Sequence, residues 1–318
     1  MIVALAGGVG GAKLADGLAR CLGENLTVIV NTGDDFEHLG LHISPDLDTV
    51  MYTLAGIANP ETGWGIAGET WNFLDQVARL GGPRWFRLGD RDLATHVVRT
   101  GRLRRGERLT LVTADLCRAL GIAAQVLPMS DDPVRTVVHS GNDTYPFQDY
   151  FVRLRCEVPV TRLAFEGAAS ARPSPEVIAA LGGKYLSAII LCPSNPYLSV
   201  DPILSVPGLR DLIVGAQVPV VAVSPIIGDA AVKGPAAKIM HELGLRPSAA
   251  TVAAHYAGLI DGLMIDDSDA HLAEAIEARG MRVRPAAILM RTLDDRKRLA
   301  EECIAFARAL HAGTRRMG

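Results

Sequence analysis

The fold is decided at the N-terminus, by the stretch Ile2-Val3-Ala4-Leu5-Ala6-Gly7-Gly8-Val9-Gly10-Gly11. Its first five residues are continuously apolar, which predicts a strand buried on both faces of a sheet. Apolar residues then recur at helical spacing between Ala15 and Leu22, and residues 26–30 predict a second buried strand. A strand, a glycine turn, a helix and a strand within about 30 residues make a βαβ unit, the building block of a parallel sheet.

The strand pattern returns in the second half of the chain. Short apolar runs predict strands at residues 186–191, 218–223, 259–265 and 283–289. Helical patterns predict helices at residues 271–279 and 292–311, and Thr292 is a plausible N-cap for the second of these. The middle of the chain has only weak strand signals, and its helical patterns lie at residues 46–57, 69–80, 90–100 and 110–120.

These patterns together predict an α/β fold, with a Rossmann-like, mostly parallel sheet flanked by helices. We predict a single domain over residues 1–318. Its core takes in about residues 1–44 and 150–318, and a mainly helical insertion takes in about residues 45–149.

The composition excludes several classes of protein. Of the 318 residues, 49% are hydrophobic and 21% charged, as in a folded globular protein, and a net charge of −3 argues against a broad nucleic-acid surface. The five cysteines form no CxxC pair, so neither a zinc site nor a disulfide framework is indicated. No apolar run reaches the roughly 18 residues that span a bilayer, and no basic segment precedes the first apolar run. We expect a cytoplasmic protein that binds neither nucleic acid nor membranes.

The glycine turn is the first candidate site. A strand that ends in glycines and opens a helix points free N–H groups and the positive end of the helix dipole at one spot. This predicts a nucleotide phosphate at Gly8, Gly10, Gly11 and Lys13. The turn is not a Walker A loop, and Lys13 stands where the dinucleotide fingerprint has its third glycine. The alternative is a plain tight turn.

Two acidic segments follow. Residues 31–35 read Asn-Thr-Gly-Asp-Asp at the carboxyl end of the second strand, where acidic groups bind a ribose hydroxyl or a metal, or else cap their own turn. Ser44-Pro45-Asp46-Leu47-Asp48-Thr49 has the N-cap and first-turn residues of a helix start. A helix start does not require two aspartates. Because residues two apart on a helix point to different sides, Asp46 and Asp48 can share one site only if the turn is partly extended.

Further polar segments lie in loops. They are Arg87-Leu88-Gly89-Asp90-Arg91-Asp92-Leu93-Ala94-Thr95-His96, Pro128-Met129-Ser130-Asp131-Asp132-Pro133, Pro193-Ser194-Asn195-Pro196 and Ser224-Pro225-Ile226-Ile227-Gly228. The first of these is alternatively a surface ion-pair cluster, and the others are alternatively ordinary turns. The last two directly follow predicted strands, where hydroxyl, amide and N–H groups suit phosphate or base recognition.

With these segments the chain resembles the CofD family, called FbiA in some bacteria, over about residues 1–290. The family comprises the 2-phospho-L-lactate transferases of coenzyme F-420 biosynthesis. The resemblance rests on the block at residues 44–49, the Leu88–His96 region, residues 127–133, Pro193-Ser194-Asn195-Pro196 and the loop at 224–228. It implies transfer of a phospho-three-carbon acid from its guanosine diphosphate-linked donor to the ribityl hydroxyl of the deazaflavin Fo, with release of GMP. It also implies a divalent cation, usually magnesium.

The resemblance implies roles for individual residues. Asp46 and Asp48 are the candidates for catalysis and for the metal. Asp48 and Arg87 match positions that contact Fo, and Asp90 and His96 belong to the same block. The guanosine diphosphate part would lie on Gly8, Gly10, Gly11, Lys13, Ser194, Asn195, Ser224 and Gly228. A displacement at phosphorus needs positioning and charge neutralisation more than a covalent nucleophile, which agrees with these residue types.

Some features depart from the family pattern or leave alternatives. Many members have Thr where this chain has Val9, so backbone groups must replace that hydroxyl. A related group of nucleotide-sugar-binding regulators, of the gluconeogenesis-factor type, shares the glycine turn but not the blocks at residues 44–49 and 89–96. A nicotinamide dehydrogenase is disfavoured by the imperfect fingerprint. The donor acid stays open among phospholactate, phosphoenolpyruvate and phosphoglycerate, and an apolar segment at residues 252–263 suggests a homodimer.

Overall fold

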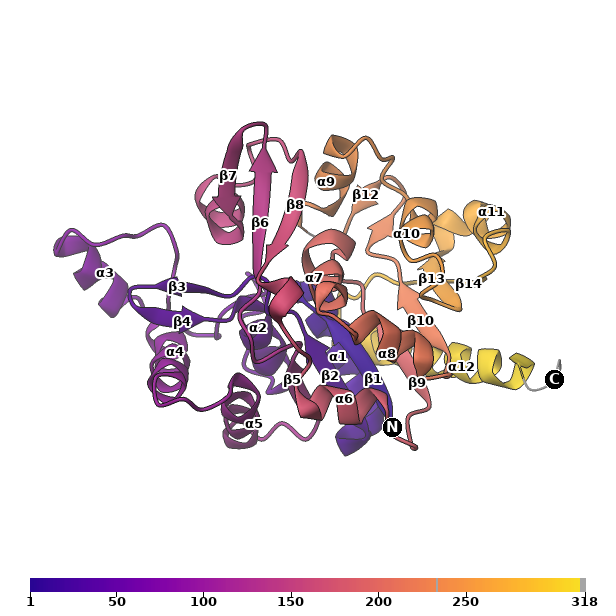
Figure 1. The fold of residues 1–318 in the computed structure, drawn as a ribbon, viewed down its shortest axis with the longest axis horizontal. Coiled ribbons are helices and arrows are strands. Elements are labelled where there is room, and N and C mark those ends of the chain that lie inside the picture. The colour runs from indigo at the N-terminus through magenta and orange to yellow at the C-terminus, as the bar shows by residue number, and fades with distance from the viewer. Residues whose placement is uncertain (233, 315–318) are drawn as a thin grey trace.

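The computed structural model describes residues 1–232 and 234–314. Within these residues the main sheet has seven strands, all parallel. The strands are β1 (Ile2–Ala6), β2 (Leu26–Val30), β5 (Gln125–Pro128), β9 (Ala188–Leu191), β10 (Val220–Val223), β13 (Gly262–Asp266) and β14 (Arg282–Ala286). Their order across the sheet is β14-β13-β10-β9-β1-β2-β5 (Figure 1). The predicted Rossmann-like α/β fold is therefore confirmed.

Helices cover both faces of this sheet. One face packs on α1 (Gly8–Leu22), α2 (Pro45–Leu54), α5 (Leu109–Ala119) and α12 (Leu293–Thr314). The other packs on α6 (Pro175–Leu181), α7 (Asp201–Ser205), α8 (Leu209–Gly215), α9 (Ala236–Glu242), α10 (Ala249–His255) and α11 (Ala273–Glu277). Each face of the sheet therefore has its own hydrophobic core, and the side chains of β1 alternate between the two. Ile2, Ala4 and Ala6 pack in the first core, and Val3 and Leu5 pack in the second.

The strand order reverses between β1 and β9. From β1 the chain runs outward through β2 to β5, and it then crosses to β9 and runs outward on the other side. In open α/β sheets the crevice at such a switch point, beyond the carboxyl ends of the strands, is the usual ligand site. Here that position lies between the glycine turn after β1 and the loop after β9, which starts at Cys192.

Small antiparallel elements surround this carboxyl edge. A hairpin, β3 (Phe36–His38) and β4 (Leu41–Ile43), follows β2. A three-stranded sheet made of β6 (Arg135–Ser140), β7 (Asp143–Pro146) and β8 (Arg162–Glu166) rises beside it (Figure 1). A short ribbon, β11 (Ile226–Ile227) and β12 (Ala230–Ala231), follows β10. The helix α3 (Asn72–Arg79) lies beyond the β3–β4 hairpin, and α4 (Asp90–Leu103) packs beside β4 (Figure 1).

The middle of the chain differs from its sequence-based description. The helices predicted there are present as α2 to α5, but β5 lies inside the range 45–149 and is an edge strand of the main sheet. The strands β6 and β7, whose signals in the sequence are weak, also lie in this mainly helical range. Four-residue strands such as β5 and β7 are too short to show a clear period of two, which explains the missing signal. Among the described residues, no helix has the length and apolar character that crossing a membrane requires.

Candidate functional site

The glycine turn forms the first turn of α1. Gly8 opens the helix with a left-handed φ of 62°, and its N–H donates to Oδ1 of Asp46 at 2.8 Å. The N–H of Gly7 donates to the Ser194 hydroxyl at 3.0 Å, and that hydroxyl donates back to the Gly7 carbonyl at 2.9 Å. A carboxylate thus lies at the positive end of α1, and the loop after β9 is fastened directly to the turn.

Close backbone packing explains most of the glycines. A side chain at Gly10 would collide with the carbonyl oxygen of Pro193, and one at Gly11 with the Ser194 hydroxyl. A Cβ at Gly7 would lie 2.5 Å from Oδ2 of Asp46. Gly10 remains partly exposed, as do Gly8 and Val9, so this side of the turn is open to a ligand.

Asp46 is held between the turn and β2. Its side chain is buried, and its Oδ2 accepts a hydrogen bond from the amide of Asn31 at 2.9 Å. The side-chain oxygen of Asn31, Oδ1, in turn accepts a hydrogen bond from the N–H of Gly33 at 2.7 Å. Burial raises the pKa of Asp46 to about 6, although the hydrogen bonds from the Asn31 amide and the Gly8 N–H oppose the rise. The carboxylate is therefore well oriented and short of positive charge.

Asp34 and Asp35 add to the buried negative charge beside Asp46. Burial, and secondly the charge of Asp46, raise the pKa of Asp34 well above its ordinary value. One carboxylate oxygen of each residue, Oδ1 of Asp34 and Oδ1 of Asp35, is buried without a hydrogen-bond partner, as is the Thr32 hydroxyl. Unpartnered oxygen atoms among buried carboxylates are the donor set that a hard divalent cation prefers.

Asp48 faces the opposite way, toward α4. Both of its oxygens accept from the fully buried guanidinium of Arg99, with one of these bonds at 3.0 Å. Asp92 accepts from the Tyr52 hydroxyl at 2.7 Å and lies 3.2 Å from Nε2 of His96. This is a compact buried network in which Arg99 supplies the positive charge.

The structure therefore separates Asp46 from Asp48. The helix α2 begins at Pro45 with regular geometry, so residues two apart point to different sides. Atoms of Asp48, Asp92 and His96 do lie within 4.8 Å of one another, close enough to surround a cation. Arg99 already neutralises Asp48 there, and an imidazole is a poor ligand for magnesium. Asp46, which is buried together with Asp34 and its unpartnered Oδ1, is the better position for that ion.

The predicted acceptor residues lie around α3 and α4. Arg87 is exposed, and its guanidinium stacks 4.1 Å from the ring centre of Trp71. Asp90 accepts four hydrogen bonds from the start of α3, and the first of these, from the Thr70 hydroxyl, does most to lower its pKa to about 2. His96 is buried inside the Arg99 network and offers no exposed edge. Of these three residues, Arg87 has the side chain most accessible to a ligand.

The predicted nucleotide residues of the second half are partly engaged by the fold. Oδ1 of Asn195 caps the turn at Pro196–Val200, whereas its buried Nδ2 has no partner. The Ser224 hydroxyl bonds within its own turn, and the N–H of Gly228 donates to Asp269. Lys13 donates to the carbonyl of Met290 at 2.9 Å, on the loop before α12. Asn195 is thus the polar side chain of this group with a donor left for a ligand.

Two functional positions had little or no signal in the sequence. Arg99 stands in an ordinary helical pattern, and nothing local marks it as the partner of Asp48, 51 residues away. Asn31 belongs to the acidic turn singled out from the sequence, but its bond to Asp46 depends on how β2 and α2 pack. Side-chain partners between distant segments follow from the tertiary fold, which single-sequence patterns do not specify.

Comparison with known proteins gives a consistent result. The family model for 2-phospho-L-lactate transferase CofD matches residues 2–296. A protein of Streptomyces griseus named phosphoenolpyruvate transferase is 44% identical, with 98% of this chain and 99% of the relative covered. A 2-phospho-L-lactate transferase of Methanosarcina mazei is 40% identical, with 94% and 98% covered. A solved structure of a UPF0052 family protein from Bacillus halodurans has a TM-score of 0.63 at 15% identity, over 95% of this chain and 98% of the other. That likeness shows a shared fold.

Proposed function

The chain belongs to the CofD family of transferases, and on this premise we propose that it joins a phospho-three-carbon acid to the deazaflavin Fo in coenzyme F-420 biosynthesis. The donor is the acid linked to guanosine diphosphate. The ribityl hydroxyl of Fo attacks the phosphorus that carries the acid, GMP leaves, and a phosphodiester forms. The alternative is a nucleotide-sugar-binding regulator without transferase activity. Regulators of that group do not share the block at residues 44–49, which this chain has.

One observation carries the proposal. The carboxyl ends of β1 and β9 meet at the switch point of the sheet, where the partly exposed Gly10 in the first turn of α1 lies against Pro193, in the loop that also carries the unpartnered amide of Asn195. A helix N-terminus and a free amide donor suit the phosphates and base of a nucleotide. The exposed Arg87 and the β3–β4 hairpin lie on the neighbouring side and suit a second, larger substrate.

We take the three-carbon acid to be the phosphoenolpyruvyl group. Relatives from Streptomyces griseus and Streptomyces avermitilis, at 44% and 46% identity, are named phosphoenolpyruvate transferase. The Methanosarcina mazei relative named for phospholactate is 40% identical. The difference in identity is small, so donor choice is one arm of the test below.

Magnesium fits the buried oxygen atoms at Asp46. We propose that Asp46 holds the ion with Asp34 as the second carboxylate, because the two charges are buried together and Oδ1 of Asp34 has no partner. Magnesium is commonly bound by one or two carboxylates plus substrate phosphates, and it neutralises the charge that builds up on the transferring phosphate. The Gly8 N–H and the Asn31 amide keep the Asp46 carboxylate in place.

Asp48 and Arg87 serve the acceptor side in this proposal. Arg99 keeps Asp48 oriented on the α4 side, and the Arg87 guanidinium is held over Trp71 with room to contact a ring or a hydroxyl. Asp90 has a structural role in this proposal, because its carboxylate, at the start of α4, accepts hydrogen bonds from the segment that begins α3.

The test is an incubation of the purified chain with Fo, Mg²⁺ and one guanosine diphosphate-linked donor at a time. Mass spectrometry of the deazaflavin product identifies the acid transferred, and the nucleotide released is identified in parallel. Asp46→Asn should fold as the wild type and lose turnover, with Asp229→Asn on the exposed β11–β12 turn as the matched control. Equal turnover of Asp46→Asn and the wild type would remove Asp46 from the mechanism.

A further inference from the structure

A histidine and an aspartate form a dyad at the rim of the site. Nε2 of His42, on β4, lies 3.1 Å from Oδ2 of Asp35. The Ser44 hydroxyl donates to the same oxygen at 2.8 Å. Asp35 is buried, whereas the His42 side chain is 18% exposed. The backbone N–H of His42 donates to the Thr100 hydroxyl at 2.8 Å, which fixes the strand against α4.

This arrangement selects one tautomer of the ring. A carboxylate can only accept hydrogen bonds, so the Nε2–H of His42 donates to Asp35 and Nδ1 carries the free lone pair. Among residues 1–232 and 234–314, Nδ1 of His42 has no hydrogen-bond partner. An imidazole oriented by a carboxylate, with its second nitrogen free and reachable from solvent, is a typical proton acceptor.

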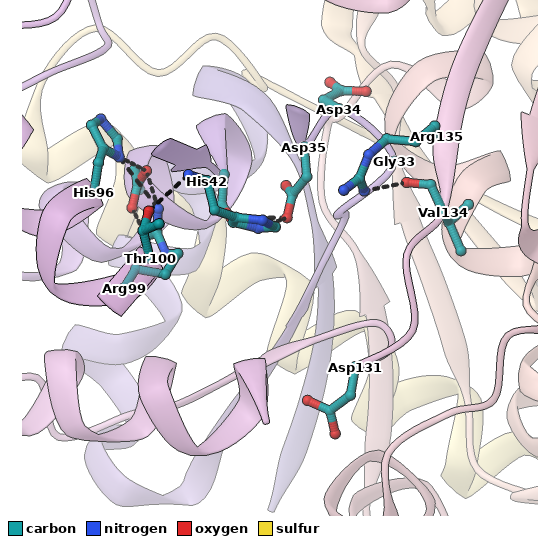
Figure 2. A network of polar contacts seen from close by, with 12 residues as sticks. Gly33, Asp34, Asp35, His42, His96, Arg99, Thr100, Asp131, Val134 and Arg135 are labelled. Carbon is teal, nitrogen blue, oxygen red and sulfur yellow. Dashed lines mark hydrogen bonds and ion pairs between the residues drawn. The ribbon is translucent and has the colours of Figure 1, made fainter. Parts of the chain in front are cut away.

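The dyad lies between the two halves of the proposed site. Figure 2 shows His42 between the pair His96 and Arg99 on one side and Asp34 and Asp35 on the other. The charge of Asp35 acts both on Asp46, on the donor side, and on Arg99, on the acceptor side. A base that takes the proton of the attacking hydroxyl has to lie at such a boundary, where acceptor and donor meet.

The aspartates nearby are less suited to this task. Both oxygens of Asp48 accept from Arg99, which has no exposed surface. Protonating Asp48 would leave that guanidinium buried and unpaired, which is strongly unfavourable. Asp46 is turned toward Gly8 and Asn31, on the donor side.

We propose that His42, oriented by Asp35, accepts the proton of the ribityl hydroxyl during the transfer. This rests on the proposed function. As the hydroxyl oxygen bonds to the donor phosphorus, its proton passes to Nδ1 of His42, and the bond between that phosphorus and the GMP oxygen breaks. GMP leaves with the electron pair of the broken bond. The imidazolium stays paired with Asp35 and then releases the proton to solvent through its exposed edge.

Charged groups surround His42 on each element that packs against it. Asp35 lies on the loop before β3, and Glu37 is directly opposite His42 in the hairpin. On α4, Arg99 lies within electrostatic reach of Asp35, and Arg104 donates to the carbonyl of Gly40. The group in direct contact with the His42 ring is thus the carboxylate of Asp35.

The first test compares His42→Gln and His42→Ala with a control, His271→Gln, at an exposed position on the far end of the sheet. Turnover is measured with saturating donor, Fo and Mg²⁺, and folding by thermal unfolding. We expect kcat to fall about 100-fold or more in both His42 variants, with KM for both substrates within about threefold of wild type. Added imidazole should restore part of the rate in His42→Ala, and the control should match wild type.

A variant of the residue that orients the imidazole gives a second, independent readout. Asp35→Asn, which removes the oriented acceptor for Nε2–H, should lower kcat without changing the affinity for guanosine diphosphate.

Three results would overturn the proposal. They are an unchanged kcat in His42→Gln, a defect confined to KM, or a rate of His42→Ala that added imidazole does not raise. An inactive wild type would instead refute the proposed transferase function, so the two failures can be told apart.

Discussion

Two aspartates of one helix turn have different environments. Asp46 caps the first N–H of α1 and lies among buried carboxylates, whereas Asp48 is neutralised by Arg99. The sequence places both in the same block and makes both of them candidates for catalysis and for the metal. The regular start of α2 sends them to opposite sides, so each requires its own test.

The raised pKa of Asp46 predicts how stability changes with pH. Its folded-state pKa is about 6 against an ordinary value of 3.8, so the folded protein binds this proton more tightly than the unfolded chain does. The stabilisation is complete below pH 3.8 and is lost as pH rises through 6. Without divalent cations, this group should lower the free energy of unfolding by about 2 kcal/mol between pH 4.5 and 7.5.

Urea unfolding of wild type and Asp46→Asn at several pH values measures this effect. Because Asn does not titrate, the difference in unfolding free energy between the two proteins should change with pH by that amount. Parallel pH profiles for the two proteins would show that Asp46 titrates as it does in the unfolded chain.

The buried pair of Asp48 and Arg99 predicts a large coupling. Arg99→Met should lower the free energy of unfolding by about 3–5 kcal/mol, because it leaves the Asp48 charge buried without a partner. The double variant Asp48→Asn with Arg99→Met should lose much less than the sum of the single changes. Urea unfolding of the four proteins completes the cycle, and additive losses would mean that the pair is not coupled.

At the scale of elements, the glycine turn does two things at once. It leaves the N-terminus of α1 partly open, and it lets the loop after β9 approach the helix backbone, as the contacts of Ser194 with Gly7 show. The sequence predicted the first property from the free N–H groups. The second depends on the neighbouring strand β9, which begins at Ala188, and is visible only in the fold.

Gly10→Ala tests the packing of that turn. The added Cβ would meet the Pro193 carbonyl, so we expect a loss of about 1–3 kcal/mol in unfolding free energy and weaker binding of guanosine diphosphate. Gly215→Ala is the control, since a Cβ there meets nothing within 4 Å and alanine favours helix. Thermal unfolding and a nucleotide titration measure both effects. If the two variants behave alike, close approach is not the reason for glycine at position 10.

Strands that are fully buried are predicted from the sequence more clearly than strands that are partly exposed. Both β1 and β2 are fully buried apolar runs, and they lie where the sequence predicts them. The strand β5 has an exposed first residue and ends at Pro128, and β7 is mostly exposed, so neither produces a clear pattern. Helices α2 and α4 have strong start signals, and their predicted starts agree with the structure within one residue.

For the whole molecule, the sequence predicts which loops meet at the carboxyl edge of the sheet. It does not predict which of their side chains bond to other parts of the protein. Parallel strands bring the glycine turn, Asn31 and the loop at Ser194 to one edge, as expected from their positions after strands. The Ser224 hydroxyl donates a hydrogen bond within its own turn, and the Lys13 side chain donates one to the carbonyl of Met290. Those outcomes depend on side-chain contacts between distant segments, which local patterns do not contain.

The central claim is transfer from a guanosine diphosphate-linked acid to Fo, and its most direct test is the mass of the product. The purified chain is incubated with Fo, Mg²⁺ and either the phosphoenolpyruvyl or the phospholactyl donor, with EDTA as the control. We predict a phosphodiester of Fo whose mass matches the phosphoenolpyruvyl adduct, equimolar GMP, and no product with EDTA. Unmodified Fo with every donor, from a folded protein, would contradict the claim.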